Sequence, residues 1–125
     1  MRHQILEFFN PTDFNCGCGC GRGLDYMSTV LLDRLYNARV LADVPFVINS
    51  AFRCQLHNAD VGGVISSAHC LGMAVDIRAG DSAVRYLVIK GAILAGFERI
   101  GVYEWGVHVD VDGSKNKGVI WLSQK

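Results

Sequence analysis

Three residues of the types that bind zinc lie in two short segments of this sequence. His69 and Asp76 lie seven residues apart, and His108 follows in the second segment. The apolar run around Asp76 predicts a short buried strand, in which a carboxylate is costly unless it is paired or binds a cation. Zinc accepts both imidazole nitrogen and carboxylate oxygen. The three residues therefore predict a zinc site whose fourth position is left to water, as in catalytic zinc sites.

The second segment, residues 107–112, alternates valine with polar residues. Such alternation places the valines on one face of a strand and the polar residues on the other. The polar face then carries His108, Asp110 and Asp112. A half-buried strand with a histidine and two carboxylates on one face is typical of an active site.

Residues at fixed spacing around the candidate ligands form a longer motif. They are Ser67, His69, Gly72, Ala74 and Asp76, followed by His108 and Asp110. This motif resembles the D-alanyl-D-alanine carboxypeptidase and dipeptidase family of zinc peptidases, which includes many phage endolysins and shares its fold with the zinc domain of hedgehog proteins. Segments 16–20, 50–54 and 57–63 also look like that family. The resemblance extends from about Phe14 to Trp121.

The resemblance implies a zinc metallopeptidase that holds the metal on the three residues above. Arg53 matches an arginine that lies beside the zinc and binds or polarises the substrate's carbonyl or carboxylate, which suits a guanidinium fork. Ser67 and His57 are further candidates for substrate binding. A capping or packing role fits His57 equally well.

Two carboxylates, Glu104 and Asp110, are candidates for the general base. Many family members place a glutamate three residues before the last histidine, where this sequence has Trp105. Glu104 would lie about 13 Å from His108 on an unbroken strand, so only a bulge or turn would bring it close. Asp110 shares the face of His108 at about 7 Å. We expect Glu104 to be the base and Asp110 to support a zinc-bound histidine, with the reverse assignment open.

The expected function is hydrolysis of a peptide bond in the peptidoglycan stem peptide or cross-link, by a phage lysis protein (endolysin) or a bacterial wall hydrolase. The alternative is a catalytically weak or inactive zinc-binding module of a virion or cell wall. The motif does not choose among D-Ala-D-Ala, L-Ala-D-Glu and cross-bridge bonds. Loops 54–66 and 113–118 would shape the pocket that makes this choice.

Composition limits the partners that we expect. The 125 residues are 50% hydrophobic and 19% charged, which suits one domain over residues 1–125. The formal net charge is +0, and without a basic cluster we expect neither nucleic acid nor a membrane as partner. The N-terminus lacks the apolar stretch of a secretory signal. We therefore expect a monomer made in the host bacterial cytoplasm that acts on the cell wall after release.

Five cysteines, an odd number, argue against a fully paired disulfide framework. Cys16, Cys18 and Cys20 with Cys54 could form a second zinc site, but their spacing along the chain is tighter than in usual zinc motifs. Simple buried thiols are the expectation. Packing is also expected for Cys70.

Residue patterns predict the elements that must position these side chains. They are an extended arm or strand over 1–14, a helix over 26–41 capped by Asp25, a buried strand over 46–48, a short helix over 55–60, the strand at Asp76, a helix from Asp81 or Ser82 to about 95, and strands over 98–103, 107–111 and 119–122. This order predicts an α+β fold in which a small, mostly antiparallel sheet bears the zinc site and two main helices pack on it.

Overall fold

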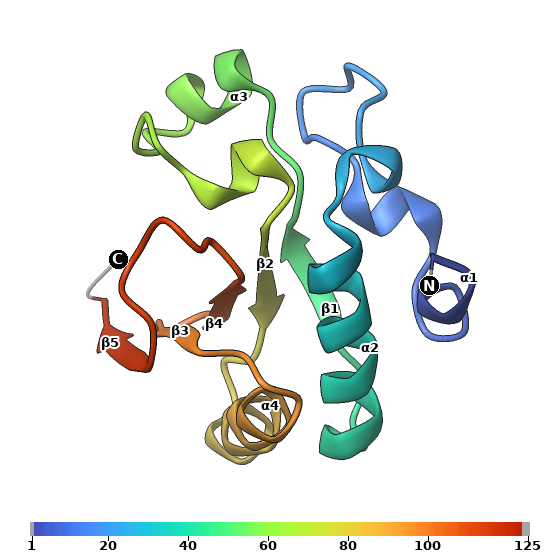
Figure 1. The fold of residues 1–125 in the computed structure, drawn as a ribbon, viewed down its shortest axis with the longest axis vertical. Helices are drawn as coiled ribbons and strands as arrows, with labels where there is room; N and C mark the ends of the chain where they lie inside the picture. Colours follow the sequence, from blue (N-terminus) through green and yellow to red (C-terminus); the bar gives the residue numbers. More distant parts are fainter. Residues whose placement is uncertain (1, 124–125) are drawn as a thin grey trace.

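A computed structural model describes residues 2–123 and shows a five-stranded sheet with helices packed on it (Figure 1). The strands are β1 (Val47–Ser50), β2 (Ala74–Arg78), β3 (Arg99–Val102), β4 (Gly106–Asp110) and β5 (Val119–Leu122). Their order is β1-β2-β4-β3-β5, and every neighbouring pair is antiparallel except β3 and β5. The predicted α+β class and mostly antiparallel sheet are confirmed.

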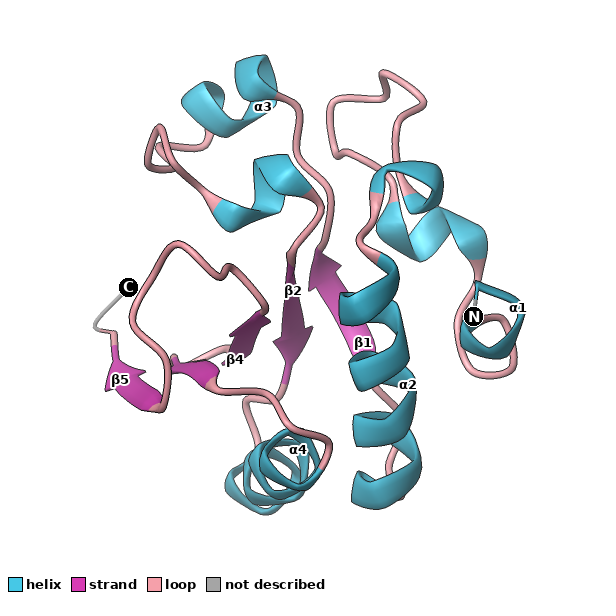
Figure 2. Ribbon diagram, in the orientation of Figure 1, coloured by secondary structure: helices cyan, strands magenta, loops and turns pink. Residues whose placement is uncertain are grey.

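The helices are α1 (Arg2–Ile5), α2 (Thr29–Ala42), α3 (Gln55–Asp60) and α4 (Ser82–Leu94). Three 3₁₀ turns supplement them: η1 (Pro11–Phe14), η2 (Leu24–Tyr26) and η3 (Ala68–Leu71). Figure 2 shows that the loops around α3 gather beyond the end of the sheet to which β1 points. Among the residues that the structure describes, no helix combines the length and apolar character needed to cross a bilayer.

The two long helices pack on one face of the sheet because both carry an apolar stripe. α2 buries Leu31, Leu32, Leu35, Ala38 and Ala42. These side chains share a core cluster with Val88 and Ala92 of α4 and with the alternate strand residues Val75, Ile77, Val107 and Val109. Alternation then turns Asp76 and His108 to the opposite face.

The caps of both long helices explain where they begin. Asp81 Oδ1 accepts hydrogen bonds from Ala83 N and Val84 N at 2.8 and 3.1 Å, so Asp81 is the cap of α4. The predicted cap of α2 is wrong. Ser28 Oγ accepts from Leu31 N, so α2 begins at Thr29, while Asp25 lies in η2.

Two predictions for the first half of the chain are wrong. Within residues 2–14 the chain forms α1 and η1 instead of an extended arm, and Asn10 N donates to Asp13 Oδ2 in a capping box that starts η1. The strand expected over 46–48 runs over 47–50 and is not wholly buried, because β1 is an edge strand. Phe46 is buried, but Val47 is 51% exposed.

Candidate metal centre

The three candidate ligands come from η3, β2 and β4. Ser67 Oγ accepts a hydrogen bond from His69 N and caps the turn that presents the His69 ring. Asp76 stands in the middle of β2, directly opposite His108 of β4 in the antiparallel register. Side chains that face each other in this way are close neighbours on one face of a sheet. Strand pairing therefore brings together two residues that lie 32 positions apart.

The donor atoms of these three side chains converge. Asp76 Oδ1 lies 2.8 Å from His108 Nδ1 and 3.2 Å from His69 Nε2. One donor atom from each residue lies within 4.8 Å of the other two. The side chains are 4% (His69), 12% (His108) and 13% (Asp76) exposed, so the cluster is largely buried yet still reached from outside.

Each histidine makes a hydrogen bond on the side of its ring that faces away from Asp76. These outer hydrogen bonds leave the other ring nitrogen of each histidine available to bind a metal ion. His69 Nδ1 lies 2.7 Å from the carbonyl oxygen of Ala51, which only accepts, so Nδ1–H donates and Nε2 keeps its lone pair. His108 Nε2 lies 2.8 Å from Asp110 Oδ2 in the same way, which leaves Nδ1 for a ligand. Both free nitrogens face Asp76. Such outer partners are the usual means of orienting zinc-binding histidines.

The protonation equilibria of the cluster show that it favours positive charge. Without a metal, the two nitrogens that face Asp76 can carry protons instead. Burial raises the pKa of the Asp76 carboxyl, but the hydrogen bonds that His108 and His69 donate in that state outweigh it and hold the pKa below its ordinary value. Burial lowers the pKa of His108, but hydrogen bonds to Asp110 and Asp76 raise it above its ordinary value. An ionised carboxylate at the centre of the cluster suits a bound cation.

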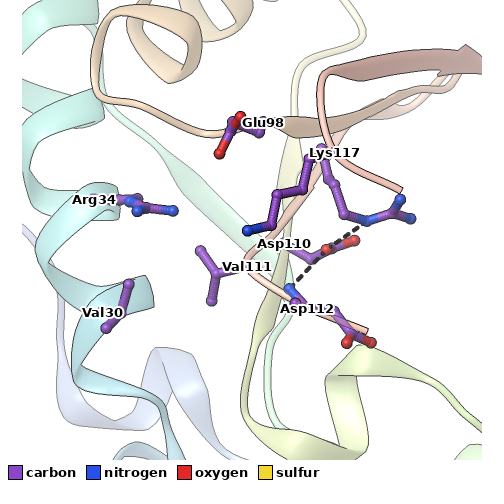
Figure 3. A pocket seen from close by; sticks show the side chains of 9 residues that line it. Val30, Arg34, Glu98, Asp110, Val111, Asp112 and Lys117 are labelled. Atoms are coloured by element: carbon purple, nitrogen blue, oxygen red, sulfur yellow. Dashed lines mark hydrogen bonds and ion pairs between the residues drawn. The ribbon is translucent and has the colours of Figure 1, made fainter. Parts of the chain in front are cut away.

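Asp110 is a buried partner of His108 and not part of the cleft wall. Its side chain is 2% exposed, and Oδ1 accepts from Arg99 Nε at 2.8 Å and from Asp112 N at 3.1 Å. Asp110 and Asp112 line a second pocket of about 170 Å³, where Figure 3 shows Arg34 across from them. Burial raises the pKa of Asp110, but the hydrogen bonds from His108 and Asp112 N hold it below its ordinary value. Both oxygens of this carboxylate are therefore occupied as acceptors.

An open cleft of about 440 Å³ leads to the cluster. Its polar and aromatic lining, apart from the candidate ligands, comprises Arg53, Ser67, Arg99, Tyr103, Trp105, Lys115 and Trp121. Arg53 Nη2 donates to Ser67 Oγ at 3.1 Å, while its buried Nε has no hydrogen-bond partner among the described residues. Arg53 also lines the cleft, so it places a cation beside the cluster.

The structure does not bring Glu104 or His57 into the cleft. Glu104 is exposed in a tight turn between β3 and β4, where Tyr103 and Gly106 exchange backbone hydrogen bonds. This turn interrupts the strand as considered above, yet Glu104 is not among the lining residues. His57 lies in α3, and its ring packs against Gly17, where a Cβ would come within 2.9 Å of Nε2.

Arg99 and Trp121 belong to the surroundings of His108 but were not predicted from the sequence as site residues. Arg99 bonds Asp110 and lies 4.9 Å from the ring centroid of Trp121, and the Trp121 ring lies 5.6 Å from that of His108. The sequence did carry a signal for Arg99, because alternation over 99–103 puts Arg99, Gly101 and Tyr103 on one face of the strand. The position of Trp121 depends on the parallel pairing of β5 with β3, which no local pattern indicates.

Comparison with known proteins adds one finding. The sequence model described as Peptidase M15 matches residues 7–112, which include all three candidate ligands and Asp110. No curated protein gives a match.

Proposed function

The chain belongs to the peptidase M15 family of D-Ala-D-Ala carboxypeptidase-type zinc peptidases, and on that premise we propose that it hydrolyses peptide bonds of the peptidoglycan stem peptide or cross-link. The observation that carries the proposal is the pair of outer hydrogen bonds that leave His69 Nε2 and His108 Nδ1 facing Asp76. These three residues would hold the zinc.

Zinc bound there would polarise the scissile carbonyl and lower the pKa of a bound water to about 7. The chain's own residues supply the rest. Asp110 accepts the Nε2–H of His108 and fixes the ring, and the Ala51 carbonyl does the same for His69. Arg53 extends its guanidinium into the cleft and binds the carbonyl or carboxylate of the substrate.

Proton transfer is assigned to Glu104. Tyr103 and Trp105, its neighbours in the turn, line the cleft. This role requires the turn to bring the Glu104 carboxylate into the cleft when substrate binds. Asp110 is the weaker candidate, because His108, Arg99 and Asp112 N already use both of its oxygens.

The peptidoglycan substrate is supported by the chemistry of the cleft. Stem peptides carry free carboxylates, and Arg53 offers a cation on the lining of the cleft. The phage lysis role is supported by the resemblance of the motif to small endolysins.

A second candidate is a zinc-binding module with little or no activity. It is favoured by the absence of any carboxylate other than Asp76 from the described lining of the cleft. Such a module would bind wall peptides through Arg53 without cutting them.

Hydrolysis of purified cell walls tests the first proposal against the second. We expect the zinc-loaded protein to clear a wall suspension, chelation to stop it, and added zinc to restore it. Asp76→Ala should be inactive, whereas Asp25→Ala, at an exposed position outside the cleft, should match the wild type. The fragments released identify the bond. A zinc-loaded protein that binds walls but releases no fragment establishes the second candidate.

A further inference from the structure

Four of the five cysteines meet on the N-terminal side of α3, away from the centre described above. They form the cysteine cluster: Cys16, Cys18, Cys20 and Cys54. In Figure 1 the light-blue loop that carries the first three lies beside the green segment that leads from β1 into α3. The distance between Cys16 Sγ and Cys18 Sγ is 3.4 Å, and Cys54 Sγ lies 3.7 Å from each of them. All four sulfurs lie within 4.8 Å of one another.

We propose that the cysteine cluster is a structural zinc site, separate from the candidate metal centre and independent of the proposed peptidase activity. Four thiolates at about 2.3 Å from a zinc ion lie about 3.8 Å apart at the corners of a tetrahedron. The three sulfur distances above match this value within a few tenths of an ångström. A site with four cysteine ligands has no open position, which suits a structural role.

The exposure of the cluster argues against simple thiol packing. Cys16 and Cys54 are buried, but Cys18 and Cys20 are exposed. A free cysteine that serves as a small apolar side chain belongs in the core. Two exposed side chains gain little from packing, yet their sulfurs lie close to the two buried ones. Metal binding explains this arrangement, and the expectation of buried thiols is wrong for Cys18 and Cys20.

Backbone groups also point at the sulfurs as donors. Cys54 N donates to Cys16 Sγ, and His57 N donates to Cys54 Sγ, both at 3.4 Å. A thiolate accepts such bonds better than a thiol because its charge strengthens them. These N–H groups would serve the thiolates as outer hydrogen bonds serve other metal ligands.

The glycines between the cysteines make the loop possible. Gly19 and Gly21 adopt φ values of +80° and +84°, which side-chain-bearing residues rarely reach, and Cys16 N donates to Arg22 O at 2.8 Å to close the loop. Alternate residues can then turn their sulfurs to one centre. The tight cysteine spacing that argued against a zinc site is thereby accommodated by the backbone.

Zinc content tests the proposal. After loading with excess zinc under reducing conditions and desalting, we expect two zinc ions per wild-type chain and one in the double variant Cys18→Ser/Cys20→Ser. Both changes are at exposed positions, so the fold should survive. Cys70→Ser is the matched control and should keep two. A double variant that retains as much zinc as the wild type overturns the proposal.

Cobalt substitution identifies which residues hold the metal. The cobalt-loaded Asp76→Ala variant should keep an intense thiolate-to-cobalt charge-transfer absorption, and the double cysteine variant should lose it. If the absorption is present but only the cysteine cluster binds metal, the proposed function fails and this proposal stands. If reduced protein shows no such absorption, or its intact mass shows two hydrogens lost to a disulfide, the proposal is overturned.

Discussion

At the scale of single residues, outer hydrogen bonds decide which ring nitrogens face Asp76. His69 and His108 use opposite nitrogens for this purpose: His69 presents Nε2 and His108 presents Nδ1. The difference follows from where the outer acceptors lie, since the Ala51 carbonyl reaches Nδ1 of one ring and Asp110 reaches Nε2 of the other. Asp110 thus acts on the centre through His108.

Asp110→Asn tests this role. The amide keeps the size of the side chain but loses the negative charge that holds His108 and Arg99, so zinc affinity should fall by about 10- to 100-fold. Competition with a chromophoric chelator measures the affinity, and Asp25→Asn serves as control. An Asp110→Asn variant that binds zinc normally but has lost all wall hydrolysis would instead identify Asp110 as the general base.

Glu104→Gln tests the assigned base. Because Glu104 is not a candidate ligand, the variant should keep its zinc while hydrolysis falls by about 10²- to 10⁴-fold. Glu98→Gln, which also removes an exposed carboxylate, should retain full activity. Normal activity in both variants would remove Glu104 from the mechanism.

At the scale of elements, the sequence predicted the pieces of the site better than their pairing. The strand at His108 and both long helices were confirmed, because each has a clear period of two or 3.6 residues, and the Asp76 strand was confirmed from its short apolar run. The register that sets Asp76 opposite His108 was not predictable, since alternation defines faces but not partners.

Short elements account for the errors. α1 and η1 contain four residues each, too few for a helical period to show, so their apolar residues suggested an extended arm. The turn that carries Glu104 follows from backbone hydrogen bonds between Tyr103 and Gly106. No side-chain pattern indicated that it would direct Glu104 outward.

The substitution Gly91→Ala, at the contact between the two long helices, has one stabilising and one destabilising effect. The higher helix propensity of alanine should stabilise α4 by about 1 kcal/mol. However, a Cβ there would lie 2.8 Å from Ala42 Cβ and 2.5 Å from Ala38 O, and such overpacking costs about 1–3 kcal/mol. We expect the overpacking to dominate and the free energy of unfolding in urea to fall. Lys90→Ala, at an exposed position of α4, should change it by less than about 0.5 kcal/mol. A Gly91→Ala variant that is more stable than the wild type would show that α2 and α4 can move apart enough to fit the methyl group at little cost.

At the scale of the whole molecule, the candidate centre joins three segments that are distant in sequence, so metal binding should stabilise the fold. A free zinc concentration of 100 times the dissociation constant adds about 2.7 kcal/mol for one site. The melting temperature should therefore rise with zinc. In the Cys18→Ser/Cys20→Ser background, where only the candidate centre remains, Asp76→Ala should abolish the rise.

The melting temperature should depend on pH in opposite ways in the metal-free and the zinc-loaded protein. The pKa values of Asp76 and Asp110 are lowered on folding, so their contribution to the free energy of unfolding is present above the ordinary pKa of 3.8 and is lost as pH falls below it. The pKa of His108 is raised on folding, so its contribution to the free energy of unfolding is present below pH 6.5 and is lost as pH rises through the raised pKa. Chelated protein should therefore melt at a lower temperature at pH 8 than at pH 5. Zinc-loaded protein should not, because metal binding requires neutral histidine. Equal melting temperatures of chelated protein at both pH values would contradict the assigned charges.

The position of β5 has a consequence for the chain during its synthesis. Trp121, beside His108 on the cleft wall, stands on a strand that pairs with β3 alone among the described strands. During synthesis His69 and Asp76 emerge from the ribosome well before His108, and Trp121 emerges later still. A nascent chain therefore has all three donor residues once β4 has emerged, but it lacks the Trp121 part of the cleft wall until β5 follows and pairs with β3.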